Sequence, residues 1–545
     1  MAKSKRAKGA KQFSKLQWSL LTACAAFVAF FGGLGIFIGE QGANNPIREA
    51  TVLATERLAV ASVSPLNSDS SSWYCTWNLP GKGGISNVSV LLANTSSKEV
   101  NATLSAFTAG GKQSRSFKFP AHSFLRYPET VTPTVQSGAV AFVASGGGTV
   151  AELEVSGQAG STVSPCNSSP SANWVVLGAN TQSGSASGIS IFNPFGQDAV
   201  IDVSLSSPSS RFNPAALRGL VIASNSYRKI DLTKYFPGLG HVSVMVTTRI
   251  GRVVVGGIVQ RNDKGDTGLA AMATFPASAS QWRFPIGELS SNQSQDILIF
   301  NPNAYEVSVN LNFSYLDLQA VPPSSSTTTS TVQAAGKAKT GTSQTRPTPA
   351  AVSNAPFDLT EAIAGDTVDV VSVKADTPIK PGLNYKVQVT VKGGYGVAAA
   401  EAFVGSTANP NTRYQVVGGT PLTTKHWIAL YDPSAMGVSG ALAWLATFDT
   451  RNSAPVSQKT PLVNLGPTYI APPGKAPAKL PIGQALIAQT SNKVLKSNVH
   501  LNTVGSLAPA VTGLIVSSKM PFALGSTMGA NPGDLYVVPV LPFAN

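Results

Sequence analysis

Short runs in which apolar and polar residues alternate recur along most of this chain, with turn residues between them. Examples are VNATLSAF at 100–107, AVIDVSLS at 199–206 and EVSVNLNF at 306–313. Alternation with a period of two buries one face of a β-strand and leaves the other face in solvent. Beyond the N-terminal region, no long stretch has apolar residues at the three- and four-residue spacing of an amphipathic helix. The pattern predicts an all-β fold.

A tryptophan opens each of four successive groups of these runs. The first three tryptophans follow one another at intervals of 101 and 108 residues, which is the length of a domain and longer than a solenoid repeat. The four residues are Trp73, Trp174, Trp282 and Trp427. The spacing therefore predicts one architectural unit that occurs four times.

The phrase Ile-Phe-Asn-Pro marks the second and third groups, at 191–194 and 299–302. In both groups its asparagine follows the opening tryptophan by 19 residues. The first group has Leu-Ala-Asn-Thr at 92–95, and the fourth has a weaker match, Thr-Phe-Asp-Thr, at 447–450. These phrases predict turns between strands, because proline fixes φ and an asparagine side chain can bond its own backbone.

Each group ends in a pair of apolar runs around a short centre, which predicts a closing hairpin. The four pairs begin at Ala139, Val242, Tyr385 and Thr512. Six or seven short strands in about 100 residues fit a two-sheet sandwich. We predict tandem immunoglobulin-like β-sandwich modules at 71–165, 172–275, 280–405 and 424–545. No Cys…Trp…Cys pattern recurs in each module, so true immunoglobulin domains are not expected.

Two of these modules contain an insertion. Residues 322–350 are rich in Ser, Thr and Pro and have almost no large apolar side chain, so we predict a disordered loop. Residues 453–481 are Pro-rich, and we expect them to be extended.

Residues 18–38 form an uncharged apolar stretch of 21 residues, which as a helix would reach roughly 30 Å, the thickness of a hydrocarbon core. The tail at 1–17 carries only basic charges, as is typical of the cytoplasmic side. We expect a single anchor in the plasma membrane, a cytoplasmic N-terminus, a linker at 39–70 and an extracytoplasmic body. A cleaved signal peptide is the alternative, but its apolar region is shorter and precedes a small-residue cleavage site.

The net charge of +14 includes six basic residues in the tail at 1–17. The other basic residues are scattered, without the stripe and interleaved aromatic residues of a nucleic-acid interface. We therefore expect no nucleic acid as a partner. Weak attraction to an anionic polymer of the envelope is compatible with the charge.

Cys75 and Cys166 are the two cysteines outside the apolar stretch, and they flank the first module. Disulfides persist outside the cytoplasm, so we predict a bond between them, worth roughly 4–5 kcal/mol for a loop of this length. Zinc is a weaker interpretation, because two thiols without neighbouring histidines are too few ligands.

The sequence contains no recognisable catalytic or metal-binding motif. The four histidines, at 122, 241, 426 and 500, have no second ligand at metal-site spacing. A Ser/His/Asp triad built from distant residues stays open, because such triads are defined by geometry. We expect no cofactor. The opening tryptophans have two interpretations, as core residues or as platforms for sugar rings, and their recurrence favours the core.

Together these features resemble a family of uncharacterised actinobacterial membrane proteins known only as a domain of unknown function. The resemblance rests on the basic tail, the single span, Trp-Tyr-Cys at 73–75 with its partner Cys166, and the repeated Ile-Phe-Asn-Pro phrase. It implies an envelope location and a β-rich exported body, and it implies no catalytic residues.

Three functions follow as hypotheses. The first is a non-enzymatic, membrane-tethered protein of the cell envelope that acts by binding or scaffolding, with envelope proteins or glycans as partners. The second is a glycan-binding accessory of cell-wall or surface-polysaccharide assembly, supported by the tryptophans. The third is an enzyme whose site lies at a junction between modules and is not visible in the sequence.

Overall fold

A computed structural model describes residues 59–544, except for 82–83, 109–110, 129–136, 264–265, 290–292, 317–355, 382, 406–413, 422–423, 432–440, 450–462, 469–484, 487–499, 505–511 and 530–534. Thr55–Asn545 form one compact unit. The predicted tail, membrane span and disordered insertion lie outside the described residues, as does most of the predicted Pro-rich insertion. Within the described part, no helix is long and apolar enough to cross a membrane.

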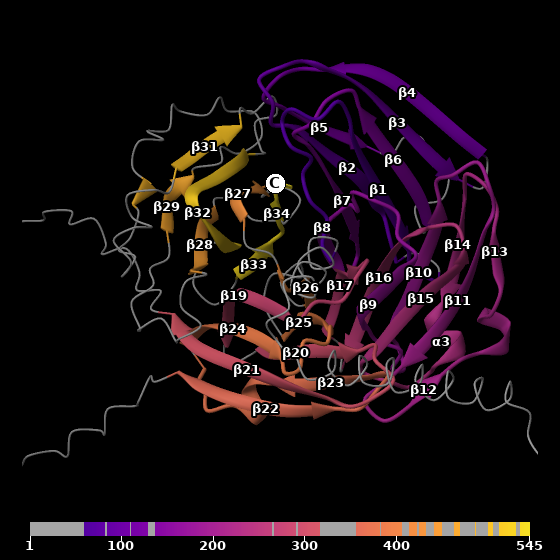
Figure 1. The fold of residues 1–545 in the computed structure, drawn as a ribbon, viewed down its shortest axis with the longest axis vertical. Coiled ribbons are helices and arrows are strands. Elements are labelled where there is room, and N and C mark those ends of the chain that lie inside the picture. The colour runs from indigo at the N-terminus through magenta and orange to yellow at the C-terminus, as the bar shows by residue number, and fades with distance from the viewer. Residues whose placement is uncertain are drawn as a thin grey trace, which may run out of the picture. The chain divides into compact units, whose positions relative to one another are not determined.

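The described chain is nearly all β, as the alternating pattern predicts, and each sheet takes its strands from one of four successive groups. We call these groups modules 1 to 4. Module 1 has two antiparallel sheets, ordered β1-β6-β3-β4 and β5-β2-β7-β8 (Figure 1). Its strands are β1 Ser71–Asn78, β2 Asn87–Asn94, β3 Val100–Thr108, β4 Gly111–Phe119, β5 Ser123–Pro128, β6 Ser137–Ala144, β7 Thr149–Gly157 and β8 Gly160–Pro165.

Module 2 repeats this plan, with sheets ordered β14-β10-β16-β17 and β12-β11-β15-β9-β18, and with β13 paired to β11. Its strands are β9 Asn173–Ala179, β10 Ala186–Asn193, β11 Ala199–Ser206, β12 Arg211–Phe212, β13 Leu220–Ile222, β14 Ser226–Asp231, β15 Val242–Ile250, β16 Val254–Asp263, β17 Asp266–Ala271 and β18 Ala273–Phe275. Two short helices connect them, the 3₁₀ helix η1 Ala215–Leu217 and α3 Leu232–Tyr235.

Module 3 has two four-stranded sheets, ordered β19-β24-β21-β22 and β23-β20-β25-β26. Its elements are β19 Gln281–Leu289, β20 Gln293–Asn301, β21 Val307–Leu316, β22 Phe357–Ile363, β23 Thr367–Ser372, α4 Val373–Asp376, β24 Leu383–Val391, β25 Ala398–Gly405 and β26 Tyr414–Gly418. The sequence pattern predicts that this module ends at residue 405, but its last strand, β26, lies beyond that residue.

Module 4 differs, because its eight described strands form one paired network, β30-β29-β28-β32-β27-β34, with β31 and β33 also paired to β32. The strands are β27 Thr424–Tyr431, β28 Ala441–Asp449, β29 Val463–Thr468, β30 Ala485–Leu486, β31 His500–Val504, β32 Thr512–Gly529, β33 Leu535–Val538 and β34 Val540–Pro542. The first part of β32 pairs with β27 and the second part with β28. The hairpin predicted from Thr512 is therefore wrong, since this stretch is one continuous strand.

The predictions of the other three closing hairpins are also wrong. The paired runs from Ala139, Val242 and Tyr385 do form two strands each, but these strands belong to opposite sheets of their module. A Gly-rich centre indicates a tight reversal of the chain, and it does not say whether the two strands then pair or cross from sheet to sheet. Here the turn crosses over the core.

Modules 1 and 2 approach each other at backbone distance, so their cores are continuous. A Cβ atom added to Gly256 in β16 would lie 2.1 Å from the carbonyl oxygen of Thr76 in β1. Beside this contact, Asn78 Nδ2 donates to the carbonyls of Ile189 and Ile230, at 3.3 and 3.2 Å. Only glycine permits this approach at position 256.

Modules 2 and 3 meet around Tyr414 in β26. Its hydroxyl is buried and donates to the carbonyl of Gly178 in β9, at 2.9 Å. Burial raises the pKa of Tyr414 to about 12, so this donor keeps its proton at neutral pH. A Cβ atom on Gly268 in β17 would lie 2.4 Å from the Cβ atom of Tyr414.

The end of the predicted linker is built into the body. Val63 is fully buried, and it donates through its N–H to Pro542 O and accepts from Ala544 N–H, both at 2.8 Å. Ser64 O accepts from Gly148 N–H at 3.0 Å. Residues 59–64, which we call the strap, thus join the first and last modules.

The close approach at Gly256 generates a stability prediction. Gly256→Ala forces a methyl group against the Thr76 carbonyl, and we expect it to lower the free energy of unfolding by roughly 1–3 kcal/mol. Gly196→Ala is the matched control, because a Cβ atom there has nothing within 4 Å. Chemical denaturation of both variants measures the difference, and equal midpoints would show that the two modules do not meet at this glycine.

Candidate functional site

Three buried asparagines occupy the same place in modules 1, 2 and 3. Asn94 ends β2, Asn193 ends β10 and Asn301 ends β20, and each has no exposed surface. In module 3 the amide nitrogen Nδ2 donates to Tyr305 O at 2.8 Å, Ile363 O at 2.9 Å and Ala364 O at 3.2 Å. Since the amide has two hydrogens and three acceptors, one hydrogen is shared.

The other two asparagines make the same bonds. Asn94 Nδ2 contacts Lys98 O, Phe119 O and Pro120 O at 2.9, 3.2 and 2.9 Å. Asn193 Nδ2 contacts Gln197 O, Ile222 O and Ala223 O at 2.7, 3.1 and 3.3 Å. In all three modules the side chain therefore joins its own turn to a second turn farther along the chain.

The oxygen of each amide is bonded as well. It accepts from the backbone N–H two residues later, at 3.0, 3.1 and 3.0 Å, the donors being Ser96, Phe195 and Asn303. This is an Asx turn, in which the side chain replaces a backbone carbonyl. The amide thus has all its donors and its acceptor occupied, which a buried amide requires.

The second turn contains a residue with positive φ in each module. His122, Asn225 and Asp366 have φ values of 47°, 50° and 58°, and they are the three non-glycine residues with positive φ in the described part of the chain. Their N–H groups donate to the carbonyls of Ser96, Phe195 and Asn303, at 3.1, 2.9 and 3.0 Å. We call this pair of turns with its asparagine the clasp.

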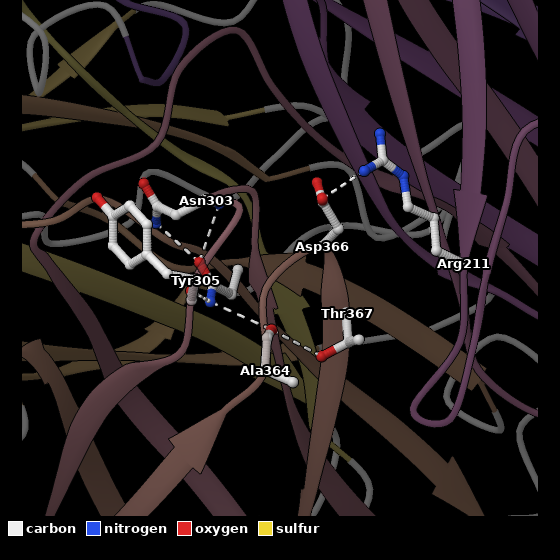
Figure 2. Close-up of polar contacts among 7 residues, drawn as sticks. Arg211, Asn303, Tyr305, Ala364, Asp366 and Thr367 are labelled. Atoms are coloured by element: carbon white, nitrogen blue, oxygen red, sulfur yellow. Dashed lines mark hydrogen bonds and ion pairs between the residues drawn. The ribbon is translucent and has the colours of Figure 1, made fainter.

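The clasp of module 3 also contacts module 2 (Figure 2). Asp366 in its second turn forms an ion pair with Arg211 of β12. Asn303 in its first turn donates through Nδ2 to Gly396 O at 3.0 Å, which joins a third turn, between β24 and β25, to the clasp. Three turns are therefore held together at this end of module 3.

The buried half of the clasp is constant and its exposed half varies. Four residues after the asparagine, module 1 presents Lys98, module 2 presents Gln197 and module 3 presents Tyr305, all on the surface. Module 2 also presents Phe195, two residues after its asparagine. Arg252 lies over the Phe195 ring, 5.5 Å from the ring centre. Tyr305 meets Tyr395 of the third turn edge to face, with ring centres 4.8 Å apart. Surface turns on a rigid frame are common positions for binding residues.

A second candidate site is a cavity of about 190 Å³ lined by all four modules and by Val60 and Ala61 of the strap. The disulfide between Cys75 and Cys166 and the side chain of Arg283 contribute to its wall. Arg283 is occupied, since it donates to Pro421 O at 3.0 Å and to Gln281 Oε1 at 2.6 Å.

Glu401 is the titratable residue of the cavity wall with the largest shift in pKa. It is buried, and burial raises its pKa to about 8, against the smaller opposite effect of a hydrogen bond from Tyr385. The Tyr385 hydroxyl contacts Glu401 Oε1 at 2.7 Å and also Gln295 Oε1.

The four opening tryptophans lie in the core, as their recurrence in the sequence predicts. Trp73 is 1% exposed, and Trp174, Trp282 and Trp427 are fully buried. In modules 1, 2 and 3 the indole N–H donates to a backbone carbonyl. This carbonyl lies at the start of the strand that follows the crossover turn, or one residue before it. The acceptors are Thr149, Val253 and Val397, at 2.9, 2.8 and 2.8 Å. The glycan interpretation of these residues therefore has no exposed ring to support it.

The predicted cysteine pair is bonded, Cys75 to Cys166. In the described part of the chain, no group of three or more His, Cys, Asp or Glu side chains is placed to hold a metal ion. The Asn-Pro phrases form turns, as predicted. The sequence did not reveal that their asparagine side chains are buried and connect two turns. The spacing of 19 residues from tryptophan to asparagine in modules 2 and 3 was a sign of this role. Nothing in the sequence pattern marked Glu401 or Tyr305 as a candidate site residue.

The comparisons with known proteins add one informative match. A model of the "Family of unknown function (DUF5719)" matches residues 136–435. The chain matches no curated protein. Among solved structures it is similar to Streptomyces avermitilis alpha-L-rhamnosidase complexed with L-rhamnose, at 8% identity and a TM-score of 0.14. That match covers 68% of this chain and 44% of the enzyme, and at this TM-score it carries no argument.

Removing a clasp amide is expected to be costly. Asn301→Ala leaves buried carbonyls without donors, and we expect a loss of roughly 2–4 kcal/mol in the free energy of unfolding. Asn310→Ala is the control, because Asn310 makes one exposed hydrogen bond of 3.4 Å. Chemical denaturation compares them, and an equal effect of the two substitutions would contradict the role of the clasp.

The buried carboxyls predict how stability depends on pH. Burial raises the pKa of both Glu152 and Glu401 to about 8 from the ordinary value of 4.5. Between these values the folded protein holds protons that the unfolded chain releases, so stability is highest at low pH and falls as the pH rises towards 8. Glu401→Gln, which resembles the protonated acid, should reduce this fall, whereas Glu306→Gln on the surface should not. Chemical denaturation between pH 4.5 and 8 measures this fall in stability. A free energy of unfolding that rises across this range would contradict the raised pKa values.

Proposed function

We propose that this chain, which belongs to the Family of unknown function (DUF5719), is a membrane-tethered scaffold of the cell envelope that acts by binding rather than by catalysis. In this proposal residues 18–38 anchor the chain in the plasma membrane with the N-terminus in the cytoplasm. The body outside the membrane consists of four tandem modules, of which the first three are immunoglobulin-like β-sandwiches and the fourth is one network of paired strands. The observation that carries the proposal is the clasp, which repeats one buried frame and varies the side chains that it presents.

The proposed location rests on the sequence and on one bond. The basic tail at 1–17 before an uncharged apolar stretch is the pattern of a cytoplasmic N-terminus followed by a span. The disulfide between Cys75 and Cys166 suits an extracytoplasmic compartment, where such bonds persist. The resemblance to uncharacterised actinobacterial membrane proteins supports the same location.

The mode of action rests on the packing of the body. Backbone-distance contacts at Gly256 and Gly268, together with the strap, hold the modules against one another. Surfaces from different modules therefore keep a constant relation, which is what a scaffold needs to bind a partner at several points.

A second candidate is an enzyme at the junction of the modules, and the cavity with Glu401 in its wall favours it. A carboxyl whose pKa is raised to about 8 is a common general acid. Here the same carboxyl bonds Tyr385 in the core, which gives it a structural role. Any hydrolase activity of the purified chain that Glu401→Gln abolishes, while the fold is kept, would favour the enzyme.

The topology can be tested directly. We expect a C-terminal alkaline phosphatase fusion to be active and a C-terminal green fluorescent protein fusion to be dark in the same cells, because the body is outside the membrane. Deleting residues 1–38 should reverse both signals. A fluorescent fusion with the full chain would contradict the proposed location, and the mass of the mature chain distinguishes a retained anchor from a cleaved signal peptide.

A further inference from the structure

Three of the four exposed aromatic rings of the described chain lie in or beside the clasp of module 3, and the fourth, Phe195, lies at the opposite end of β11 from Phe212. Four aromatic side chains are exposed in this part of the protein, by 37% to 48% of their surface. Phe195 lies in the first turn of the module 2 clasp, and Tyr305 lies in the first turn of the module 3 clasp. Tyr395 contacts Tyr305, and Phe212 follows Arg211, which pairs with Asp366 of the module 3 clasp. The other large rings, including the four opening tryptophans, are buried or half-buried.

The clasps hold these rings in place before any ligand arrives. The backbone N–H of Phe195 donates to the Asn193 side chain at 3.1 Å, and the carbonyl of Tyr305 accepts from Asn301 at 2.8 Å. The turn that contains Tyr395 is fixed to the clasp through Asn303 Nδ2 and Gly396 O, at 3.0 Å. Aromatic side chains with few free torsions on a fixed backbone lose little entropy on binding.

Polar groups stand beside the rings. The carboxylate of Asp366 and the guanidinium of Arg211 pair at the edge of the module 3 clasp and remain partly exposed, by 18% and 38% of their side chains (Figure 2). The hydroxyls of the two tyrosines add two further groups that can donate and accept. The patch therefore combines two tyrosine rings in edge-to-face contact with a charged pair beside them.

This combination fits a carbohydrate chain. A pyranose ring has an apolar C–H face that stacks on an aromatic ring, and hydroxyls at its edge that bond carboxylate, guanidinium and phenol groups. We propose that the surface at the module 3 clasp, formed by Tyr305, Tyr395 and Asp366 together with Arg211 and Phe212 of module 2, binds a glycan chain of the cell envelope.

The inference deepens the proposed function, since it rests on a binding scaffold and names the class of its ligand. It moves the sugar contacts from the tryptophans, which are core residues, to the rings at the turns.

The test measures binding of the full chain in detergent to three insoluble polysaccharides: peptidoglycan sacculi, chitin and cellulose. We expect at least one of them to retain the protein in 0.5 M NaCl, because ring stacking persists when salt screens the charges of a basic protein. The double variant Tyr305→Ala with Tyr395→Ala should weaken that retention at least tenfold. The control Val143→Ala removes an equally exposed apolar side chain of module 1 and should change it less than twofold.

Three results would overturn the inference. These are no retention of the wild-type chain on any of the polysaccharides, retention that 0.5 M NaCl abolishes, and equal retention of the double variant and Val143→Ala. Thermal unfolding of each variant shows that the fold is kept, which is expected because both tyrosines lie at the surface. The topology fusions are scored separately, so a glycan-binding body on the cytoplasmic side would contradict the proposed location alone. An exported body that binds no polysaccharide would contradict this inference alone.

Discussion

In each of modules 1, 2 and 3, the fold depends on the buried side-chain amide of one asparagine. An asparagine side chain taken out of water without partners costs several kcal/mol, so the surrounding backbone must supply its acceptors and its donor. At Asn94, Asn193 and Asn301 it does so with the same set of carbonyls and the same N–H. The requirement selects one geometry for two turns that lie 25 to 62 residues apart in the sequence. A clasp of this kind leaves the outward side chains free to vary.

The modules are held together by equally local means. Glycine at 256 allows two backbones to touch, Tyr414 carries a hydrogen bond from one module to the next, and the strap at 59–64 joins the first module to the last. Because these contacts are short and buried, the modules behave as one body and not as beads on a string. The module 3 clasp and the edge of module 2 at Arg211 are consequently held in one constant relation.

Much of this fold was predictable from the chain, and the exceptions have physical reasons. The alternating runs predict strands, and the opening tryptophans and the cysteine pair lie where the repeats place them. The crossover turns after Ala139, Val242 and Tyr385 were predicted as hairpins, because a Gly-rich reversal has the same local chemistry in both cases. Pairing depends on which sheet each strand joins, and that depends on contacts distant in sequence.

The candidate site was harder to anticipate. Asn301 could be read as a turn residue, but the carbonyls of Ile363 and Ala364 that surround it are about 60 residues away. Tyr305 differs from Gln197 and Lys98 at the equivalent positions, so the repeat pattern draws no attention to it. Exposure of the rings, which makes them candidates for binding, follows from the packing of the whole module.

Hydrogen–deuterium exchange of the full chain tests the central claim, that the clasps are rigid. The backbone N–H groups of His122, Asn225 and Asp366 lie in surface turns, yet each donates to a carbonyl within its clasp. The account predicts exchange at least about a hundredfold slower than in an unstructured chain at all three amides. Exchange at the unprotected rate would show that the turns open freely, and the fixed binding face would then be contradicted.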